Sequence, residues 1–271
     1  MTIAERAQTF AGLHAGPKLL ILPNAWDAGS ARIIESAGAT AIATSSAAVA
    51  WAHGYADGQF LPFETLLAAV SEIAKTVSVP VSADIEGAYA QDAATAARTV
   101  GQVIEAGAVG INIEDGNDAP DLLAGKIENL KAAAARAGVP LWVNARVDTY
   151  LRKLVAADKA YDETVRRARL YRAAGADSIF APALVETADL ARLVKDVVLP
   201  LNVLAWPGLA DAAALEAIGV RRLSAGSGIG KAALGHTLQL AKAFLAEGRS
   251  EPVTGGPLTN PEINAMMRRG S

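Results

Sequence analysis

The stretch Ala106-Gly107-Ala108-Val109-Gly110-Ile111-Asn112-Ile113-Glu114-Asp115 joins a glycine, a short apolar run and two acidic residues. A glycine just past a helix is the usual left-handed cap, and a short β-branched run after it is typical of a buried parallel strand. The same order of features recurs around Gly38, Gly138, Gly175 and Gly219. Each recurrence therefore marks a helix, then a strand, then polar residues at the end of that strand.

Apolar runs of this kind predict eight strands, with helical patterns between them. Alternation of strands and helices along a chain gives a parallel sheet. Eight such units favour closure into a (β/α)8 TIM barrel, and an open doubly wound sheet stays the alternative. The expected strands are Leu19–Leu22, Ala41–Thr44, Val79–Ala83, Val109–Ile113, Leu141–Ala145, Ser178–Ala181, Leu199–Leu204 and Arg221–Ser224.

The length of 271 residues suits one barrel followed by a tail, because barrels of this class take about 250 residues. We expect the barrel over residues 1–248, with a long last helix from about Lys231 to Glu247. The tail 249–271 begins with a Pro/Gly-rich hinge, Pro252 to Pro257, and then allows a short helix over Pro261–Arg269. A boundary near residue 248 is therefore predicted.

Composition narrows the class of protein. The net charge is −3, 52% of residues are hydrophobic, and no dense Lys/Arg block occurs, so neither nucleic acid nor an anionic membrane is an expected partner. The absence of cysteine excludes disulfides, thiolate zinc sites and cysteine nucleophiles. Residues 1–16 do not resemble a signal peptide, and no apolar run reaches the roughly 18 residues of a membrane span. We expect a cytoplasmic protein.

Polar side chains gather where the predicted strands end, which is where barrels of this class place their active sites. Carboxylates that converge there repel one another unless something compensates their charge, and Mg²⁺ does so with oxygen ligands and retained waters. Two interpretations stay open: a metal site, or structural ion pairing of the acids with Arg146. The strand-end residues are Asn24, Asp27, Ser45, Ser46, Asp84, Glu86, Glu114, Asp115, Arg146, Asp148, Trp206 and Ser224 to Ser227, and Asp27 is expected to serve only as a helix cap.

Two further features carry weaker signals. The segment from Gly226 to Lys231, GSGIGK, is too short for the Walker pattern, so it is either an anion cradle at the start of the last helix or a tight turn. The histidines His14, His53 and His236 show no metal-ligand spacing, and we expect structural or exposed positions for them.

Several ordered segments together resemble the isocitrate lyase/phosphoenolpyruvate mutase family. The resemblance covers roughly Leu22 to Leu245. It rests on LPNAWDAGSARIIESAG, TSSAAVAWAHGYADG, VPVSADIEGAY, GINIED, NARVDTY and PLNVLAWPG. It implies a barrel that uses Mg²⁺, or Mn²⁺, to act on a small α-oxo or 2-hydroxy carboxylate through an enolate-type intermediate.

The resemblance also implies roles for individual residues. Asp57, Asp84 and Glu114 match the family's acidic residues around the metal and its waters, and Arg146 matches its substrate-binding arginine. Segment 45–47 matches the part that binds the oxo-acid end of the substrate. The implied sets are therefore Asp84, Glu86, Glu114 and Asp57 for the metal, Ser45, Ser46, Ala47 and Arg146 for the substrate, and Asp57, Arg146 and Glu114 for catalysis.

This chain departs from the family pattern in two places. The family's D-x-D is here Ser82-Ala83-Asp84. By strand alternation we expect Glu86, two residues beyond Asp84, on the same face, where it could replace the missing acid or leave ligation to water. The lyase branch carries a K-K-C-G-H loop with a catalytic thiol, but Glu114 is followed here by Asp115-Gly116-Asn117-Asp118-Ala119-Pro120. Cleavage of isocitrate or 2-methylisocitrate is therefore not expected.

The resemblance leads to an expected function with two alternatives. The expectation is a Mg-dependent carbon–carbon lyase, decarboxylase or hydrolase. One alternative is P–C bond chemistry on phosphonopyruvate, and the other is a non-catalytic α-oxo-acid-binding protein. Family members also exchange their last barrel helix between subunits. A homodimer or homotetramer is therefore expected, with Met266 and Met267 of the tail covered by a partner.

Overall fold

The computed structural model describes residues 1–256 and 258–268, and in these residues nine parallel strands form one sheet. The order of the strands is β1-β9-β8-β7-β6-β5-β4-β3-β2. Their bounds are β1 Leu20–Leu22, β2 Asn24–Ala25, β3 Ile42–Thr44, β4 Val81–Asp84, β5 Gly110–Glu114, β6 Trp142–Arg146, β7 Ser178–Phe180, β8 Leu201–Leu204 and β9 Arg222–Ser224.

The sheet closes through its first barrel strand, which is divided into two short segments. Only Pro23 separates β1, which pairs with β9, from β2, which pairs with β3. Proline has no N–H to donate and interrupts the ladder, while its carbonyl still accepts from the Ala43 N–H at 3.1 Å. Eight strand positions therefore close the circle, and the predicted (β/α)8 barrel is confirmed with its first strand split in two.

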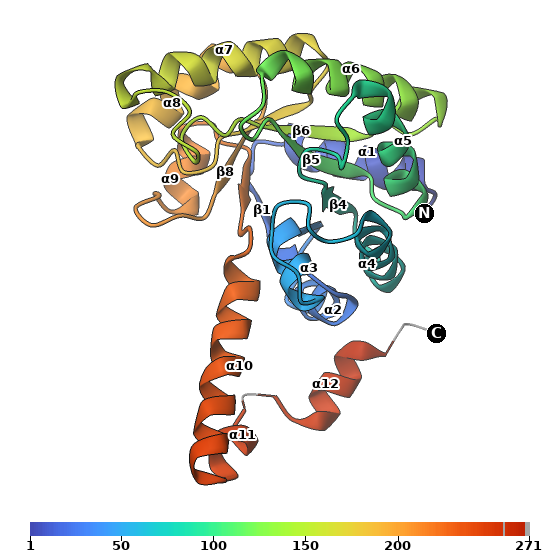
Figure 1. The fold of residues 1–271 in the computed structure, drawn as a ribbon, viewed down its shortest axis with the longest axis vertical. Coiled ribbons are helices and arrows are strands. Elements are labelled where there is room, and N and C mark those ends of the chain that lie inside the picture. The colour runs from blue at the N-terminus through green and yellow to red at the C-terminus, as the bar shows by residue number, and fades with distance from the viewer. Residues whose placement is uncertain (257, 269–271) are drawn as a thin grey trace.

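Helices surround the strands and follow them in chain order (Figure 1). Apolar residues at helical spacing turn toward the strands, as Leu66, Val70 and Ile73 of α4 do, and all three are buried. The helices are α1 Ile3–Ala15, α2 Ala28–Ser36, α3 Ser46–Ala52, α4 Phe63–Thr76, α5 Ala93–Glu105, α6 Pro120–Arg136, the 3-10 turn η1 Ala157–Lys159, α7 Ala160–Ala173, α8 Thr187–Val197, α9 Ala212–Ala217, α10 Gly228–Glu247, α11 Glu251–Thr254 and α12 Asn260–Met267.

The N-terminal helix α1 packs where the strands begin, at the end of the barrel away from the predicted site. Phe10 lies so close to Gly110 that a Cβ there would come within 2.5 Å of its ring. His14 donates from Nδ1 to the Phe10 carbonyl at 2.9 Å and stacks on Trp142 at 4.3 Å between ring centroids. His14 is thus structural, as its sequence context predicted.

The barrel interior contains a chain of polar side chains that the apolar strand pattern did not predict. The Trp142 indole N–H donates to Ser178 at 2.8 Å, Ser178 donates to Asn144 at 2.7 Å, and Asn144 donates to Asn112 at 2.8 Å. The guanidinium of Arg222 reaches the same Asn112 oxygen at 3.3 Å, and burial lowers its pKa to about 9. The interior therefore holds a buried hydrogen-bond network beneath the mouth.

The long helix α10 leaves the barrel as an arm (Figure 1) and ends at Gly248, which takes the left-handed conformation at φ 64°. Leu238 and Leu245 on this helix are 56% and 85% exposed. The tail then returns to its own barrel, because Arg32 of α2 donates from Nε to the Met266 carbonyl of α12 at 3.0 Å.

The predicted tail helix, Pro261–Arg269, is found as α12, Asn260–Met267, with Met266 and Met267 half-buried. Residue 257 of the predicted hinge and residue 269 of the predicted helix lie outside the described residues. We find no helix in the described part of the chain that is long and apolar enough to cross a membrane.

Candidate active site

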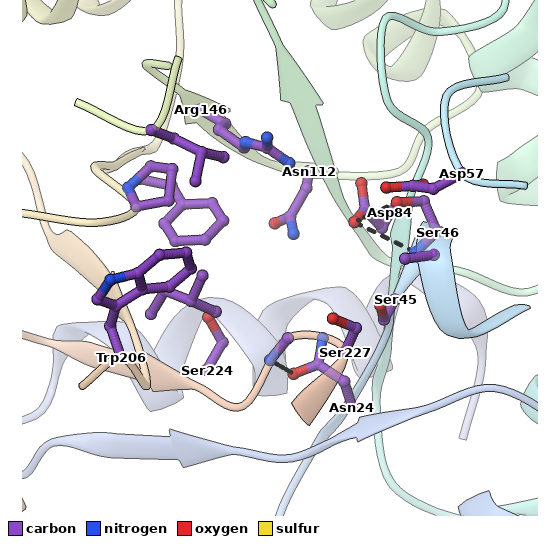
Figure 2. Close-up of a pocket in the computed structure, with 16 residues that line it drawn as sticks. Asn24, Ser45, Ser46, Asp57, Asp84, Asn112, Arg146, Trp206, Ser224 and Ser227 are labelled. Carbon is purple, nitrogen blue, oxygen red and sulfur yellow. Dashed lines mark hydrogen bonds between the residues drawn. The ribbon is translucent and has the colours of Figure 1, made fainter. Parts of the chain in front are cut away.

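A pocket of about 170 Å³ opens at the carboxyl ends of the strands (Figure 2). This volume lies below the ~300–1,000 Å³ of pockets for drug-sized ligands, so it suits a small metabolite. Its lining comes from nearly every strand end, as expected for a barrel of this class. The lining residues are Asn24, Ser45, Ser46, Ala47, Asp57, Asp84, Asn112, Arg146, Leu151, Phe180, Pro182, Leu204, Trp206, Ser224, Gly226 and Ser227.

Asp84 ends β4 and carries the carboxylate that is central to the pocket. Its backbone N–H donates to the Thr44 hydroxyl at 2.9 Å, which fixes the end of the strand. Its Oδ2 accepts from the N–H and hydroxyl of Ser46, but at the long distances of 3.3 and 3.2 Å (Figure 2). Burial raises the pKa of Asp84, against the opposing effects of Arg146 and of the Ser46 and Glu86 N–H groups. Arg146 and these long hydrogen bonds compensate the carboxylate, while the direct ion pairs of Arg146 go to Glu114 and Asp148.

The pocket acids fit a hard divalent cation, although they do not form a closed ligand cage. Asp57 and Asp84 line the same cavity, and the ion pairs of Arg146 go to other carboxylates. Across the described residues, no group of three or more His, Cys, Asp or Glu side chains is arranged to hold a metal ion. Mg²⁺ commonly uses one or two carboxylates, waters and substrate oxygens. The two acids suit that mode of binding.

Arg146 ends β6 and is held by acids on both sides. Its Nη1 pairs with Glu114, and its Nε and Nη2 donate to Asp148 at 2.6 and 3.1 Å. Burial acts against the charge of Arg146, but these carboxylates outweigh it and raise the pKa of the guanidinium. Arg152, in the loop after β6, also donates to Asp148 at 2.8 Å. The guanidinium is therefore fixed in orientation where it lines the pocket.

Glu114 thus takes part in the ion pairing that the sequence left open as an alternative to metal ligation. Burial raises the pKa of Glu114, against the opposing effect of Arg146. Glu114 does not line the pocket itself. Its contact with a metal therefore stays a prediction.

Glu86 lies in a turn and does not continue the strand. The strand ends at Asp84, and Glu86, Ala88 and Tyr89 adopt positive φ values of 50°, 70° and 49°, which are strained for residues with a side chain. Lys126 of α6 supports the turn by donating to the Gly87 carbonyl at 2.9 Å. The expectation that Glu86 shares a face with Asp84 is therefore wrong, because strand alternation stops at Asp84.

The Glu86 carboxyl is buried beside the pocket and outside its lining. Burial, together with Asp84 and Asp57, raises its pKa to about 7. The Tyr89 hydroxyl donates to it at 3.3 Å. Its role as a metal ligand stays a prediction.

The segment 45–47 forms the beginning of α3, and all three residues line the pocket. Ser45 caps this helix through its hydroxyl, although the bond to the Ala48 N–H is long at 3.4 Å. On the neighbouring strand, Asn24 donates to the Thr44 carbonyl at 2.8 Å and accepts from the Gly226 N–H at 2.8 Å, which joins β2 to the turn after β9. The first turn of α3 and the GSGIGK turn therefore both border the cavity.

Close packing explains two of the three glycines of GSGIGK, whereas a Cβ on Gly228 would meet no atom within 4 Å. A Cβ on Gly226 would lie 2.6 Å from Leu204, and one on Gly230 would lie 2.8 Å from the Ala48 side chain. Gly226 also has a φ of 56°, which favours glycine. These contacts support the interpretation of this segment as a tight turn.

Some acids at the strand ends are structural. Asp27 caps α2 by accepting from the Ser30 N–H at 2.6 Å, as predicted. Asp115 is buried and accepts from Arg167 at 2.8 Å, from Tyr171 at 2.6 Å and from the Asp148 N–H at 2.9 Å. The β5–α6 connection, which lacks the family's cysteine loop, is thus short and fixed at its first residue.

Sequence reasoning missed five residues of the pocket: Asn112, Leu151, Phe180, Pro182 and Leu204. Asn112 is a polar residue within an apolar run, which is a usable signal. The other four are apolar and have no sequence signal of function, because apolar residues near strand ends are ordinarily core.

The fold and the pocket define a closed parallel α/β barrel with a small, charged site at its mouth. A family model for phosphoenolpyruvate phosphomutase matches residues 10–245. The chain therefore belongs to the phosphoenolpyruvate phosphomutase family, as the sequence motifs predicted.

Two relatives are similar to this chain over most of its length. An uncharacterized protein of Mycobacterium tuberculosis H37Rv is 36% identical over 220 residues, which cover 81% of this chain and 82% of that protein. A solved structure from Burkholderia cenocepacia J2315, described only provisionally as a lyase/mutase, has a TM-score of 0.89 and 33% identity, with 97% and 95% of the two chains covered.

Relatives with named reactions are somewhat more distant. The phosphonopyruvate hydrolase of Variovorax sp. Pal2 is 32% identical over 70% of each chain. A solved phosphonopyruvate hydrolase, in complex with oxalate and Mg²⁺, has a TM-score of 0.84 at 25% identity and covers 96% and 94% of the chains. The 2-methylisocitrate lyase of Bacillus subtilis (27% identical, covering 73% of this chain and 66% of that one) and the oxaloacetate decarboxylase of Ectopseudomonas mendocina (29%, covering 62% and 59%) are also similar. These names span three different reactions.

Proposed function

We propose that this protein is an enzyme that uses Mg²⁺ or Mn²⁺ to cleave a carbon–carbon bond of a small 2-oxo or 2-hydroxy carboxylate, as a lyase, decarboxylase or hydrolase. The observation that carries this proposal is the convergence of Asp57, Asp84 and Arg146 on one small cavity. Relatives named for cleavage of 2-methylisocitrate and decarboxylation of oxaloacetate support the reaction class.

The chain's own residues divide into those that hold a cation and those that hold the substrate. Asp84 and Asp57 would hold the cation, with Glu86 and Glu114 proposed as further acids around it. When bound, a divalent cation stabilises negative charge that develops on the substrate's oxo oxygen. Arg146 would bind a substrate carboxylate with a guanidinium that Glu114 and Asp148 already orient.

The beginning of α3 would hold the oxo-acid end of the substrate. Ser45, Ser46 and Ala47 all line the pocket. Ser46 also contacts Asp84, so binding at this helix is linked to the position of the acid. In this proposal Asp57, Arg146 and Glu114 form the catalytic set, in which Glu114 acts by positioning Arg146.

A screen for products tests this function. The protein is incubated with a series of 2-oxo and 2-hydroxy acids, including oxaloacetate, with Mg²⁺ or with a chelator, and products are followed by proton NMR. We expect cleavage products only with the metal. Metal-dependent binding without turnover of any acid would instead indicate the non-catalytic binding protein.

Phosphonopyruvate chemistry is the second candidate, and the 32% identity to a phosphonopyruvate hydrolase favours including it. The same incubation with phosphonopyruvate, followed by phosphate release, tests it. Release that is faster than cleavage of every carbon substrate would replace the first proposal with the second.

We also propose that the barrel and the tail have different functions. Residues 1–248 form the catalytic barrel, and residues 249–271 form a tail that contributes to assembly. The left-handed end of α10 at Gly248 supports this boundary.

A further inference from the structure

The pocket has two chemically different sides. Asp57, Asp84 and Ser46 lie on one side, and Trp206 lies on the other (Figure 2). Four apolar residues also line the pocket, and they come from the ends of β7 and β8 and from the loops after β6 and β7. The neighbouring strands β7 and β8 lie across the barrel from β3 and β4, which carry the acidic side. We call these five residues the apolar wall: Leu151, Phe180, Pro182, Leu204 and Trp206.

The wall is held in place by the packing of the barrel. Phe180 is the register partner of Arg146 on the neighbouring strand, and it is only 5% exposed. Leu204 packs against Gly226 so closely that a Cβ there would lie 2.6 Å away. Trp206 is 42% exposed, a large fraction for an indole that faces a pocket. Covering its ring with an apolar group would therefore remove apolar surface from water.

The pocket lining also carries little positive charge. Among the residues that the structure describes around the cavity, Arg146 is the single cationic side chain. Glu114 and Asp148 already accept hydrogen bonds or ion pairs from it. A second anionic group of a substrate, turned toward the apolar wall, would lie against apolar side chains with no second cation of the lining to pair with it.

We infer that the substrate is a small 2-oxo or 2-hydroxy acid whose far end is an apolar, branched alkyl or aryl group seated on the apolar wall. This inference rests on the proposed function, which places the oxo-acid end at Asp84, Arg146 and the start of α3. It makes Trp206 a specificity-determining residue.

A matched pair of ligands tests the inference. Oxaloacetate and 4-methyl-2-oxopentanoate have nearly the same shape, but the far end is a carboxylate in the first and an isopropyl group in the second. Dissociation constants are measured by calorimetry with Mg²⁺ for both, for pyruvate and for oxalate. We expect 4-methyl-2-oxopentanoate to bind at least tenfold tighter than pyruvate, since each buried methylene contributes about fourfold. It should also bind tighter than freshly prepared oxaloacetate.

Three variants at one exposed position provide the controls. Trp206→Phe should keep most of the preference for 4-methyl-2-oxopentanoate over oxaloacetate, and Trp206→Ala should reduce it severalfold. Trp206→Arg places a cation on the wall and should reverse the preference. Circular dichroism and melting curves check that each variant is folded.

The outcomes separate this inference from the proposed function. If oxalate binds with Mg²⁺ but wild type prefers oxaloacetate, or if Trp206→Arg leaves the preference unchanged, the inference is wrong and the oxo-acid site stands. If neither oxalate nor any 2-oxo acid binds in the presence of metal, the proposed function and the inference both fail.

Discussion

Glu114 and Arg146 are register partners on the adjacent strands β5 and β6, and their side chains form an ion pair at the mouth of the barrel. The pairing follows from the parallel sheet, which brings the carboxyl ends of both strands to the same edge. It fixes the guanidinium before any ligand arrives, and such preorganisation reduces the entropy lost on binding.

Loss of the Asp84 charge should remove metal-dependent ligand binding. In Asp84→Asn, we expect Mg²⁺ and oxalate together to produce no rise in melting temperature. Without ligands the variant should be at least as stable as wild type, because burial already disfavours the charged form. Thermal shift measures both, and Asp158→Asn, at an exposed site, is the control that should keep the rise. An unchanged rise in Asp84→Asn would remove Asp84 from the metal site.

Replacing Arg146 with lysine should weaken ligand binding although the charge is kept. A lysine cannot hold Glu114 and Asp148 and also present two parallel donors to a carboxylate. We expect the affinity for oxalate to fall by about 1–3 kcal/mol, the range for charge-assisted hydrogen bonds. Arg152→Lys changes a 39% exposed side chain that pairs with the same acids, and it should reduce the affinity for oxalate by less. Equal affinity of Arg146→Lys and wild type by calorimetry would exclude this role.

His14 should make the protein less stable in mild acid. Burial lowers its pKa from 6.5 to about 3, so the unfolded state binds a proton near pH 6.5 and the folded state does not. The stabilisation is complete above pH 6.5 and is lost as the pH falls toward 3, by about 2 kcal/mol at pH 5. Denaturant unfolding should show a smaller loss between pH 7 and 5 in His14→Gln than in wild type. His236→Gln, at an exposed position, is the control. If both variants lose the same unfolding free energy between pH 7 and 5, His14 is not the source of the acid sensitivity.

Isocitrate and 2-methylisocitrate should not be cleaved at a useful rate. The chain contains no cysteine to act as the acid, and the connection after Glu114 is short and held through Asp115. Assays for glyoxylate and for pyruvate release check this expectation. Efficient release from either substrate would mean that another residue supplies the proton.

Self-association should depend on α10. Ile21 on the outer face of β1 is 56% exposed, in a groove that Ile34 and Ile229 also line. A barrel strand is ordinarily covered there by a helix, and we propose that α10 of a second copy covers it. Light scattering should give a mass above the 27.9 kDa of one chain.

Variants on α10 test the same proposal. Leu238→Glu, on the apolar face of α10, should lower the mass toward the monomer, whereas Gln239→Glu should not. A wild-type monomer at micromolar concentration would rule out a stable helix-exchanged dimer. Because α12 rests on its own α2, deleting residues 250–271 should have a smaller effect than Leu238→Glu.

The sequence by itself determined the architecture and the family, because both depend on local, repeated patterns. Glycine caps such as Gly107 and Gly175 end helices through backbone conformation alone, and apolar runs after them specify strands. The motifs around Asp84, Glu114 and Arg146 located the mouth of the barrel, because parallel strands all end at one edge.

Only the tertiary structure decided which side chains meet. The sequence could not show that Glu114 pairs with Arg146, because the contact depends on strand register and on burial that strengthens charge pairing. It placed Glu86 beside Asp84 by strand alternation, which the positive φ of Glu86 breaks. The sequence singled out Trp206, but Phe180 and Leu204 of the apolar wall had no local signal, since an apolar residue becomes part of a site only when neighbouring strands bring it to the same cavity.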